Sequence, residues 1–101
     1  MTSALRIERV DADHVRIGGE LGFGNAQDGV ARTEELFSGA RSDVTVDLGG
    51  LARSDSATLG VLLIWSARAA LRGARLRFSN VPAGLRALAH LCDAEPLLGI
   101  A

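Results

Sequence analysis

The chain has 101 residues, of which 48% are hydrophobic and 4% aromatic, and its formal net charge is −1. This length predicts a single domain, residues 1–101, with an aliphatic core that buries about two-thirds of the unfolded surface. Eleven arginines spread along the chain argue against nucleic-acid binding, and the longest apolar run, Leu59–Trp65, is too short to span a membrane.

The first half of the chain predicts two strands and a helix. Alternation of apolar and polar residues predicts an edge strand over Leu5–Val10, a turn at Asp11–Asp13 and a second strand over the sequence HVRIGGEL. After a glycine-rich stretch, Asn25 is expected to cap a helix over Ala26–Ser38. Gly29 weakens that helix by about 1 kcal/mol relative to alanine.

The second half predicts a crossover unit and a final helix. Its elements in order are a strand, a loop, a helix, a strand and a last helix: Asp43–Leu48, Gly49–Asp55, Ser56–Arg72, Arg75–Asn80 and the segment that Pro82 opens. The order β-β-α-β-α-β-α predicts an α/β domain, a mixed four-stranded sheet with helices packed on it. We expect a right-handed connection from Val44 to Phe78 and a central parallel part.

The helix over Ser56–Arg72 has two candidate faces. A rotation of about 100° per residue predicts one sheet-facing stripe, made of Leu59, Leu62, Leu63, Ser66 and Ala70. The opposite side carries four residues that we predict to form a partner interface, because Trp and Arg are enriched at binding hot spots: Val61, Ile64, Trp65 and Arg68. Weak self-association through this patch is also expected. The alternative is that Trp65 packs under a neighbouring helix of the same domain.

An Asp-Ser pair precedes this helix. Either Asp55 or Ser56 can serve as the N-cap, which stabilises a helix by about 1 kcal/mol. The pair also follows a strand, at the carboxyl edge of the predicted sheet, where ligands and partners bind and where free N–H groups favour an anion. Two roles therefore stay open for Asp55, Ser56 and Thr58: local capping, or regulation and docking.

The segment VDLGGLARSDSATLGVLL resembles the central segment of STAS domains, in which a strand ending in Asp-Leu leads to an Asp-Ser or Asp-Thr pair at a helix start. The segment GGELGFGNA, residues 18–26, fits the second strand and the first helix entry of that family. The tryptophan after the leucine run and the segment LRFSNVPAGLRALAHL, residues 76–91, are most similar to the MlaB-type branch. Members of that branch are STAS subunits of a phospholipid transporter in Gram-negative inner membranes.

The resemblance implies an STAS fold and a non-catalytic accessory subunit of an ABC-type phospholipid transporter that maintains outer-membrane lipid asymmetry. The implied partner is the cytoplasmic ATPase subunit and, through it, a permease in the inner membrane. The implied location is cytoplasmic and peripheral at the inner membrane. We also expect no signal peptide, because residues 1–4 lead directly into a strand pattern.

The alternative function is an anti-sigma-factor antagonist regulated by phosphorylation of Ser56. Many STAS antagonists have glycine two residues after the phosphorylated serine, whereas this chain has Thr58. A β-branched residue there is expected to narrow the approach of a kinase. A module that binds a small ligand is a third possibility, with less support because the sequence names no convergent polar pocket.

We expect no catalytic site. Ser56 lies beside Asp55, but a serine nucleophile needs a base, and no spacing brings His14 or His90 to it. Asp47 is expected to end its strand, and Asp55 to order the loop, rather than to form an acid/base or metal pair.

No cofactor or metal site is predicted either. The glycines at 18–24 match neither a P-loop nor a full dinucleotide fingerprint. The single Cys92 excludes an internal disulfide and a cysteine-based zinc site. It is expected to be buried on the apolar face of the last helix, together with Leu85, Leu88 and Ala89.

Overall fold

The computed structural model describes residues 4–37 and 43–99, and the strands in these ranges form one sheet. Their order across the sheet is the same as along the chain: β1 (Arg6–Asp11), β2 (His14–Leu21), β3 (Val44–Ser54) and β4 (Leu76–Ser79). β1 and β2 are an antiparallel hairpin, whereas β3 pairs in parallel with both β2 and β4. The expected mixed four-stranded sheet is therefore confirmed.

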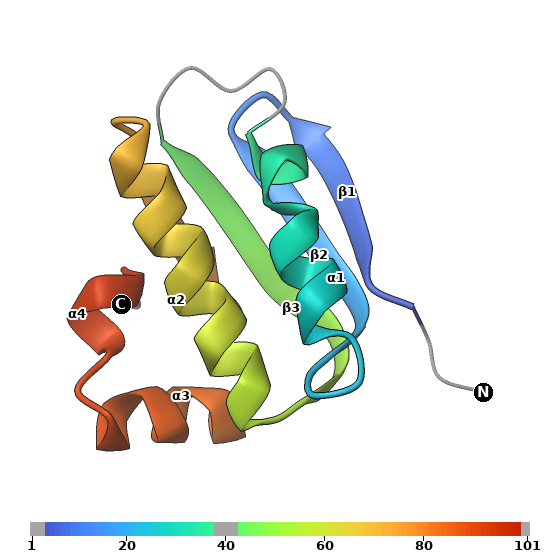
Figure 1. The fold of residues 1–101 in the computed structure, drawn as a ribbon, viewed down its shortest axis with the longest axis vertical. Coiled ribbons are helices and arrows are strands. Elements are labelled where there is room, and N and C mark those ends of the chain that lie inside the picture. Colours follow the sequence, from blue (N-terminus) through green and yellow to red (C-terminus); the bar gives the residue numbers. More distant parts are fainter. Residues whose placement is uncertain (1–3, 38–42, 100–101) are drawn as a thin grey trace.

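Helices cover one face of this sheet, as Figure 1 shows for α1 and α2, which lie side by side across it. The helical segments in chain order are α1 (Ala26–Ala31), a 3-10 turn η1 (Thr33–Leu36), α2 (Ser56–Leu71), α3 (Ala83–Leu91) and α4 (Glu95–Leu98). In β2, Val15 and Ile17 are buried under the helices, while His14 and Arg16 on the opposite face are exposed. The hairpin therefore has one apolar and one polar face, as expected for a two-layer domain.

β3 is longer than the sequence predicted. It continues through Ser54, so the loop expected at Gly49–Asp55 is wrong, and Asp47 lies inside the strand rather than at its end. The added residues pair with the end of β2, where a Cβ atom on Gly50 would lie 2.8 Å from the Ile17 carbonyl oxygen. Gly50, which suggested a loop, is therefore a position where two strands approach closely, whereas Gly49 packs against the side chains of Asp47 and Asn80.

The first helix is shorter than predicted. α1 ends at Ala31 and η1 follows it, while Ser38, the expected end, lies outside the described residues. Asn25 does occupy the N-cap position, but its side chain makes no cap hydrogen bond. Its Oδ1 accepts from the Gly22 N–H and its Nδ2 donates to the Glu20 carbonyl, so Asn25 holds the preceding loop instead.

The largest core side chain belongs to α2. Trp65 is fully buried, and its Nε1 donates to the Gly29 carbonyl of α1 at 3.0 Å. A Cβ atom on Gly29 would lie 2.9 Å from Leu21 Cδ1 and 3.3 Å from Val61 Cγ1. Gly29 therefore lets α1 come close enough to cover the indole, which explains why a poor helix former stands in the middle of α1.

Burial along α2 departs from the predicted single stripe. Leu59 and Leu62 are buried as expected, but Leu63 and Ser66 are half-buried and Ala70 is exposed. The remaining buried residues of the helix lie outside that stripe: Thr58, Val61, Trp65 and Ala69. The sheet and α1 both cover α2, so its buried arc is wider than contact with the sheet alone would require.

The C-terminal part of the chain also differs from the sequence prediction. Leu85 and Ala89 of α3 are buried as expected, but Cys92 is exposed because α3 ends at Leu91 and the chain turns at Asp93, where φ is 53°. Pro96 lies in the first turn of α4. Among residues 4–37 and 43–99, no helix combines the length and the apolar character needed to cross a membrane.

Candidate functional site

Asp55 is the N-cap of α2. Its Oδ1 accepts hydrogen bonds from the N–H groups of Ala57 at 2.8 Å and Thr58 at 3.3 Å. Thr58 Oγ1 in turn accepts from the Asp55 N–H at 2.9 Å, which completes a capping box. Ser56 is therefore the first residue inside the helix, and the choice left open by the sequence is settled in favour of Asp55 as the cap.

Thr58 is structural and cannot form part of a docking surface. It is fully buried, and its Oγ1 also donates to the Leu21 carbonyl at the end of β2. The hydroxyl thus joins the start of α2 to the sheet. Because the β-branched side chain points inward, it does not narrow the approach to Ser56, and this part of the sequence interpretation is wrong.

Ser56 is exposed, and the next residue, Ala57, is the first α2 residue to line an apolar groove between α1 and α2, which we name the α1–α2 groove. The groove has a volume of about 450 Å³, and its lining is mostly small or aliphatic: Ala26, Gln27, Val30, Ala31, Ala57, Gly60, Val61, Ile64 and Arg68. A Cβ atom on Gly60 would meet nothing within 4 Å, so the groove is open at that point.

The predicted partner interface on α2 is half wrong. Trp65 and Val61 are buried inside the domain, so neither can anchor a partner, while Ile64 is 39% exposed and Arg68 is exposed. The Arg68 guanidinium donates to the Val30 carbonyl at 3.0 Å and to Thr33 Oγ1 at 3.2 Å. Arg68 therefore fixes one end of the groove as well as bordering it.

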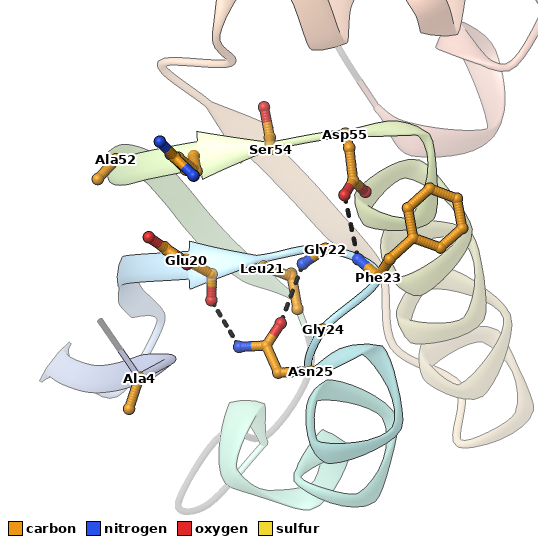
Figure 2. A pocket seen from close by; sticks show the side chains of 11 residues that line it. Ala4, Glu20, Leu21, Gly22, Phe23, Gly24, Asn25, Ala52, Ser54 and Asp55 are labelled. Atoms are coloured by element: carbon orange, nitrogen blue, oxygen red, sulfur yellow. Dashed lines mark hydrogen bonds between the residues drawn. The ribbon is translucent and has the colours of Figure 1, made fainter. Parts of the chain in front are cut away.

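A short loop between β2 and α1, residues 22–25, lies next to the start of α2 (Figure 2). Asp55 Oδ2 accepts from the Phe23 N–H at 3.1 Å, so the same carboxylate that caps α2 also holds this loop. The loop borders a hollow of about 710 Å³, which Glu20, Arg53 and Ser54 also line. The sequence analysis missed Phe23, although an aromatic residue flanked by glycines and outside any apolar period was a usable signal.

A separate polar cluster surrounds Asp47. Its Oδ1 accepts from Asn80 Nδ2 at 3.0 Å and from the Gly49 N–H at 2.8 Å, and its Oδ2 lies 3.7 Å from Arg16 Nε. The Asn80 and Gly49 hydrogen bonds and the Arg16 charge hold the pKa of the Asp47 carboxyl below its ordinary value. Asp47 therefore accepts hydrogen bonds in a cluster with Asn80 and Gly49, whereas Asp55 caps α2.

The structure does not place either histidine in the Ser56 site. His90 lies at the end of α3 with its Nδ1 2.7 Å from Glu95 Oε1, and His14 lies in the hairpin 4.0 Å from Asp11. Within the described ranges, no group of three or more His, Cys, Asp and Glu residues could hold a metal ion. What the site offers chemically is an exposed hydroxyl, an apolar groove and an exposed aromatic ring.

Solved structures share this fold at low sequence identity. The cell fate determinant SpoIIAA of Bacillus, in its phosphorylated form, matches with a TM-score of 0.68 and 22% identity over 97% of this chain and 91% of that chain. An anti-sigma factor antagonist from Mycobacterium paratuberculosis matches with a TM-score of 0.69 and 15% identity, over 96% and 83% of the two chains.

The protein TM1081, solved by NMR, has a TM-score of 0.69 and 15% identity, covering 100% of this chain and 82% of that chain. No curated protein sequence matches at a significant level. The family model of the MlaB STAS domain, by contrast, matches residues 5–99. The chain therefore belongs to the STAS domain family, in its MlaB-type branch.

Proposed function

We propose that this protein is a non-catalytic accessory subunit that binds the cytoplasmic ATPase subunit of an ABC-type phospholipid transporter. The observation that carries the proposal is the exposed, apolar α1–α2 groove, whose lining residues on α2 begin at Ala57, directly after the exposed Ser56. The family match over residues 5–99 supports this choice of partner. Through the ATPase, the protein would act on a permease in the inner membrane, on the cytoplasmic side, in a system that maintains outer-membrane lipid asymmetry.

The groove has the features of a helix-binding surface. Ala26 and Ala57 are small, Gly60 has no side chain, and Ile64 supplies an exposed aliphatic contact. Small residues let a partner backbone approach closely, and an amphipathic helix lies in such a groove with its apolar face inward. Ser56 lies directly before Ala57, so a larger side chain at position 56 would crowd a partner bound in the groove.

The proposal is tested by titrating the full chain with the purified ATPase subunit. Ser56→Ala is expected to bind within about twofold of the wild type and to change the free energy of unfolding by less than about 0.5 kcal/mol, because Asp55 is the cap. Ser56→Glu is expected to fold normally, since an acid in the first turn suits the helix dipole, yet to weaken binding about tenfold or more by crowding the contact. A wild-type chain that does not bind, or a Ser56→Glu chain that binds equally well, would refute the proposal.

A second candidate function is an anti-sigma-factor antagonist that is phosphorylated on Ser56. The observation in its favour is that the Ser56 side chain is exposed and that the buried Thr58 leaves its approach open. Incubation with an anti-sigma-factor kinase and ATP, followed by mass spectrometry, separates the two functions. Phosphate on Ser56, absent from Ser56→Ala, together with no affinity for the ATPase subunit, would establish the second function in place of the first.

A further inference from the structure

We propose that Phe23 is an aromatic anchor that inserts into an apolar pocket of the ATPase subunit, and that Asp55 positions it. This inference rests on the proposed function, since it names a contact made by the same docking surface. It extends that surface beyond the α1–α2 groove, across the start of α2, to the loop at residues 22–25.

Phe23 differs from every other aromatic residue of the chain. Trp65 is fully buried, and Phe37 and Phe78 are each 4% exposed, whereas Phe23 is 76% exposed. A single exposed apolar residue is common and carries no meaning alone. The loop that carries Phe23, residues 22–25, is however held firmly by hydrogen bonds and close packing.

Three side-chain hydrogen bonds hold the loop. Asn25 Oδ1 accepts from the Gly22 N–H at 3.0 Å, Asn25 Nδ2 donates to the Glu20 carbonyl at 2.8 Å, and Asp55 Oδ2 accepts from the Phe23 N–H at 3.1 Å (Figure 2). The packing is close as well, because a Cβ atom on Gly22 would lie 2.4 Å from Asp55 Oδ2. A loop backbone held in place before binding loses little conformational freedom when a partner covers it.

The two oxygens of Asp55 have separate partners. Oδ1 caps α2 through Ala57 and Thr58, and Oδ2 holds the Phe23 amide. The Phe23 backbone is thereby tied to the residue that precedes Ser56, and the loop leads directly into Ala26 of the α1–α2 groove. The Phe23 backbone therefore lies next to the N-cap of α2 and three residues before Ala26, the first residue that lines the groove.

The charges beside Phe23 favour a protein partner over an anionic lipid surface. The adjacent hollow is lined by the acidic Glu20 and Asp55 and by a single basic residue, Arg53. Membrane-surface anchors combine aromatic or aliphatic residues with several Lys or Arg side chains, because basic residues are attracted to anionic lipids. Because only one basic residue lines the hollow beside Phe23, its ring is better suited to an apolar pocket on a protein than to an anionic lipid surface.

Affinity measurements on the full chain test the anchor. Phe23→Ala is expected to raise the Kd for the ATPase subunit about thirtyfold or more, the hot-spot scale, without lowering the melting temperature. Val10→Ala removes another exposed apolar side chain, 56% exposed on β1, and should leave the Kd unchanged. A wild-type chain that does not bind overturns the partner and the anchor together, whereas a Phe23→Ala chain with wild-type affinity overturns only the anchor.

A second pair of variants tests the role of Asp55. Asp55→Asn keeps an oxygen that can cap α2, but its amide nitrogen cannot accept from the Phe23 N–H. We expect Asp55→Asn to speed hydrogen exchange of the Phe23 amide about tenfold or more, and to raise the Kd several-fold in the wild-type background but not in the Phe23→Ala background. Additive effects on the Kd, or a Phe23 amide that exchanges freely in the wild type, would refute positioning by Asp55.

The lipid alternative is tested with vesicles of anionic phospholipid. The full chain is expected to show no Phe23-dependent sedimentation with them. Sedimentation that Phe23→Ala abolishes, combined with an unchanged Kd for the ATPase subunit, would assign the ring to a membrane surface and overturn the inference.

Discussion

Two stretches of α2 face α1, and only one of them is covered. Around Trp65, Gly29 brings the helices so close that the indole is buried and hydrogen-bonded across the contact. Around Gly60 and Ile64, the same pair of helices leaves an open groove whose lining residues on α2 begin at Ala57. Helix periodicity alone does not distinguish these stretches, because the neighbouring helix decides which part of a face is core and which part is surface.

The largest expected effect is at the covered stretch. Trp65→Ala is expected to destabilise the domain by about 3–5 kcal/mol, because it leaves a cavity and an unpaired Gly29 carbonyl. Trp65→Phe, which keeps much of the volume, should cost clearly less. Chemical denaturation measures both. A Trp65→Ala chain as stable as the wild type would mean that the indole is not part of the core, and the two stretches would no longer differ.

An intermediate effect is expected where α2 meets the sheet. Thr58→Val keeps the shape of the side chain but leaves the Asp55 N–H and the Leu21 carbonyl without their hydroxyl partner. The cost should be about 1–3 kcal/mol of unfolding free energy. Thr58→Ser keeps the hydroxyl and should retain most of the unfolding free energy that Thr58→Val loses. Equal stability of the valine and serine variants would show that the hydroxyl does not join α2 to β2.

The smallest effect is expected at Asp47, away from both stretches. Because the native pKa of Asp47 is lowered, its contribution to stability is complete above its ordinary pKa of 3.8 and is lost as pH falls through the lowered native value. Because Arg16 is exposed and solvent screens its charge, the contribution of Asp47 to the free energy of unfolding is about a few tenths of a kcal/mol. Compared with Asp47→Asn, the wild type should lose slightly more stability over that acid range, by thermal melts, with no difference in affinity for the ATPase subunit. A difference in affinity at neutral pH would place Asp47 in the docking surface.

Much of the fold could be predicted because local patterns and tertiary packing agree there. The alternation in β1 and β2, and the length of α2, came directly from the spacing of apolar residues. The glycines were misread in two places. Gly49 and Gly50 suggested a loop, and Gly29 suggested only a weak helix. In the structure, each of these glycines lies where atoms from another part of the chain come so close that a larger residue would not fit easily.

The site could be predicted only in part. A cap at either Asp55 or Ser56 follows from local chemistry, and the structure assigns it to Asp55. The roles of Trp65, Thr58 and Phe23 depend on α1, β2 and Asp55 respectively, at sequence separations of more than thirty residues. A helical wheel of α2 contains none of those partners, so it could not predict that Trp65 is buried under α1 or that Phe23 lies next to the start of α2.

The most direct test of docking at the uncovered stretch is the affinity of Gly60→Leu for the ATPase subunit. A Cβ atom on Gly60 would meet nothing within 4 Å outside its own stretch of helix, and replacing a helical glycine stabilises a helix by up to about 1 kcal/mol. We therefore expect this variant to melt at or above the wild-type temperature while its affinity falls at least about tenfold, because leucine fills the groove. Wild-type affinity in a stably folded Gly60→Leu chain would contradict docking in the α1–α2 groove.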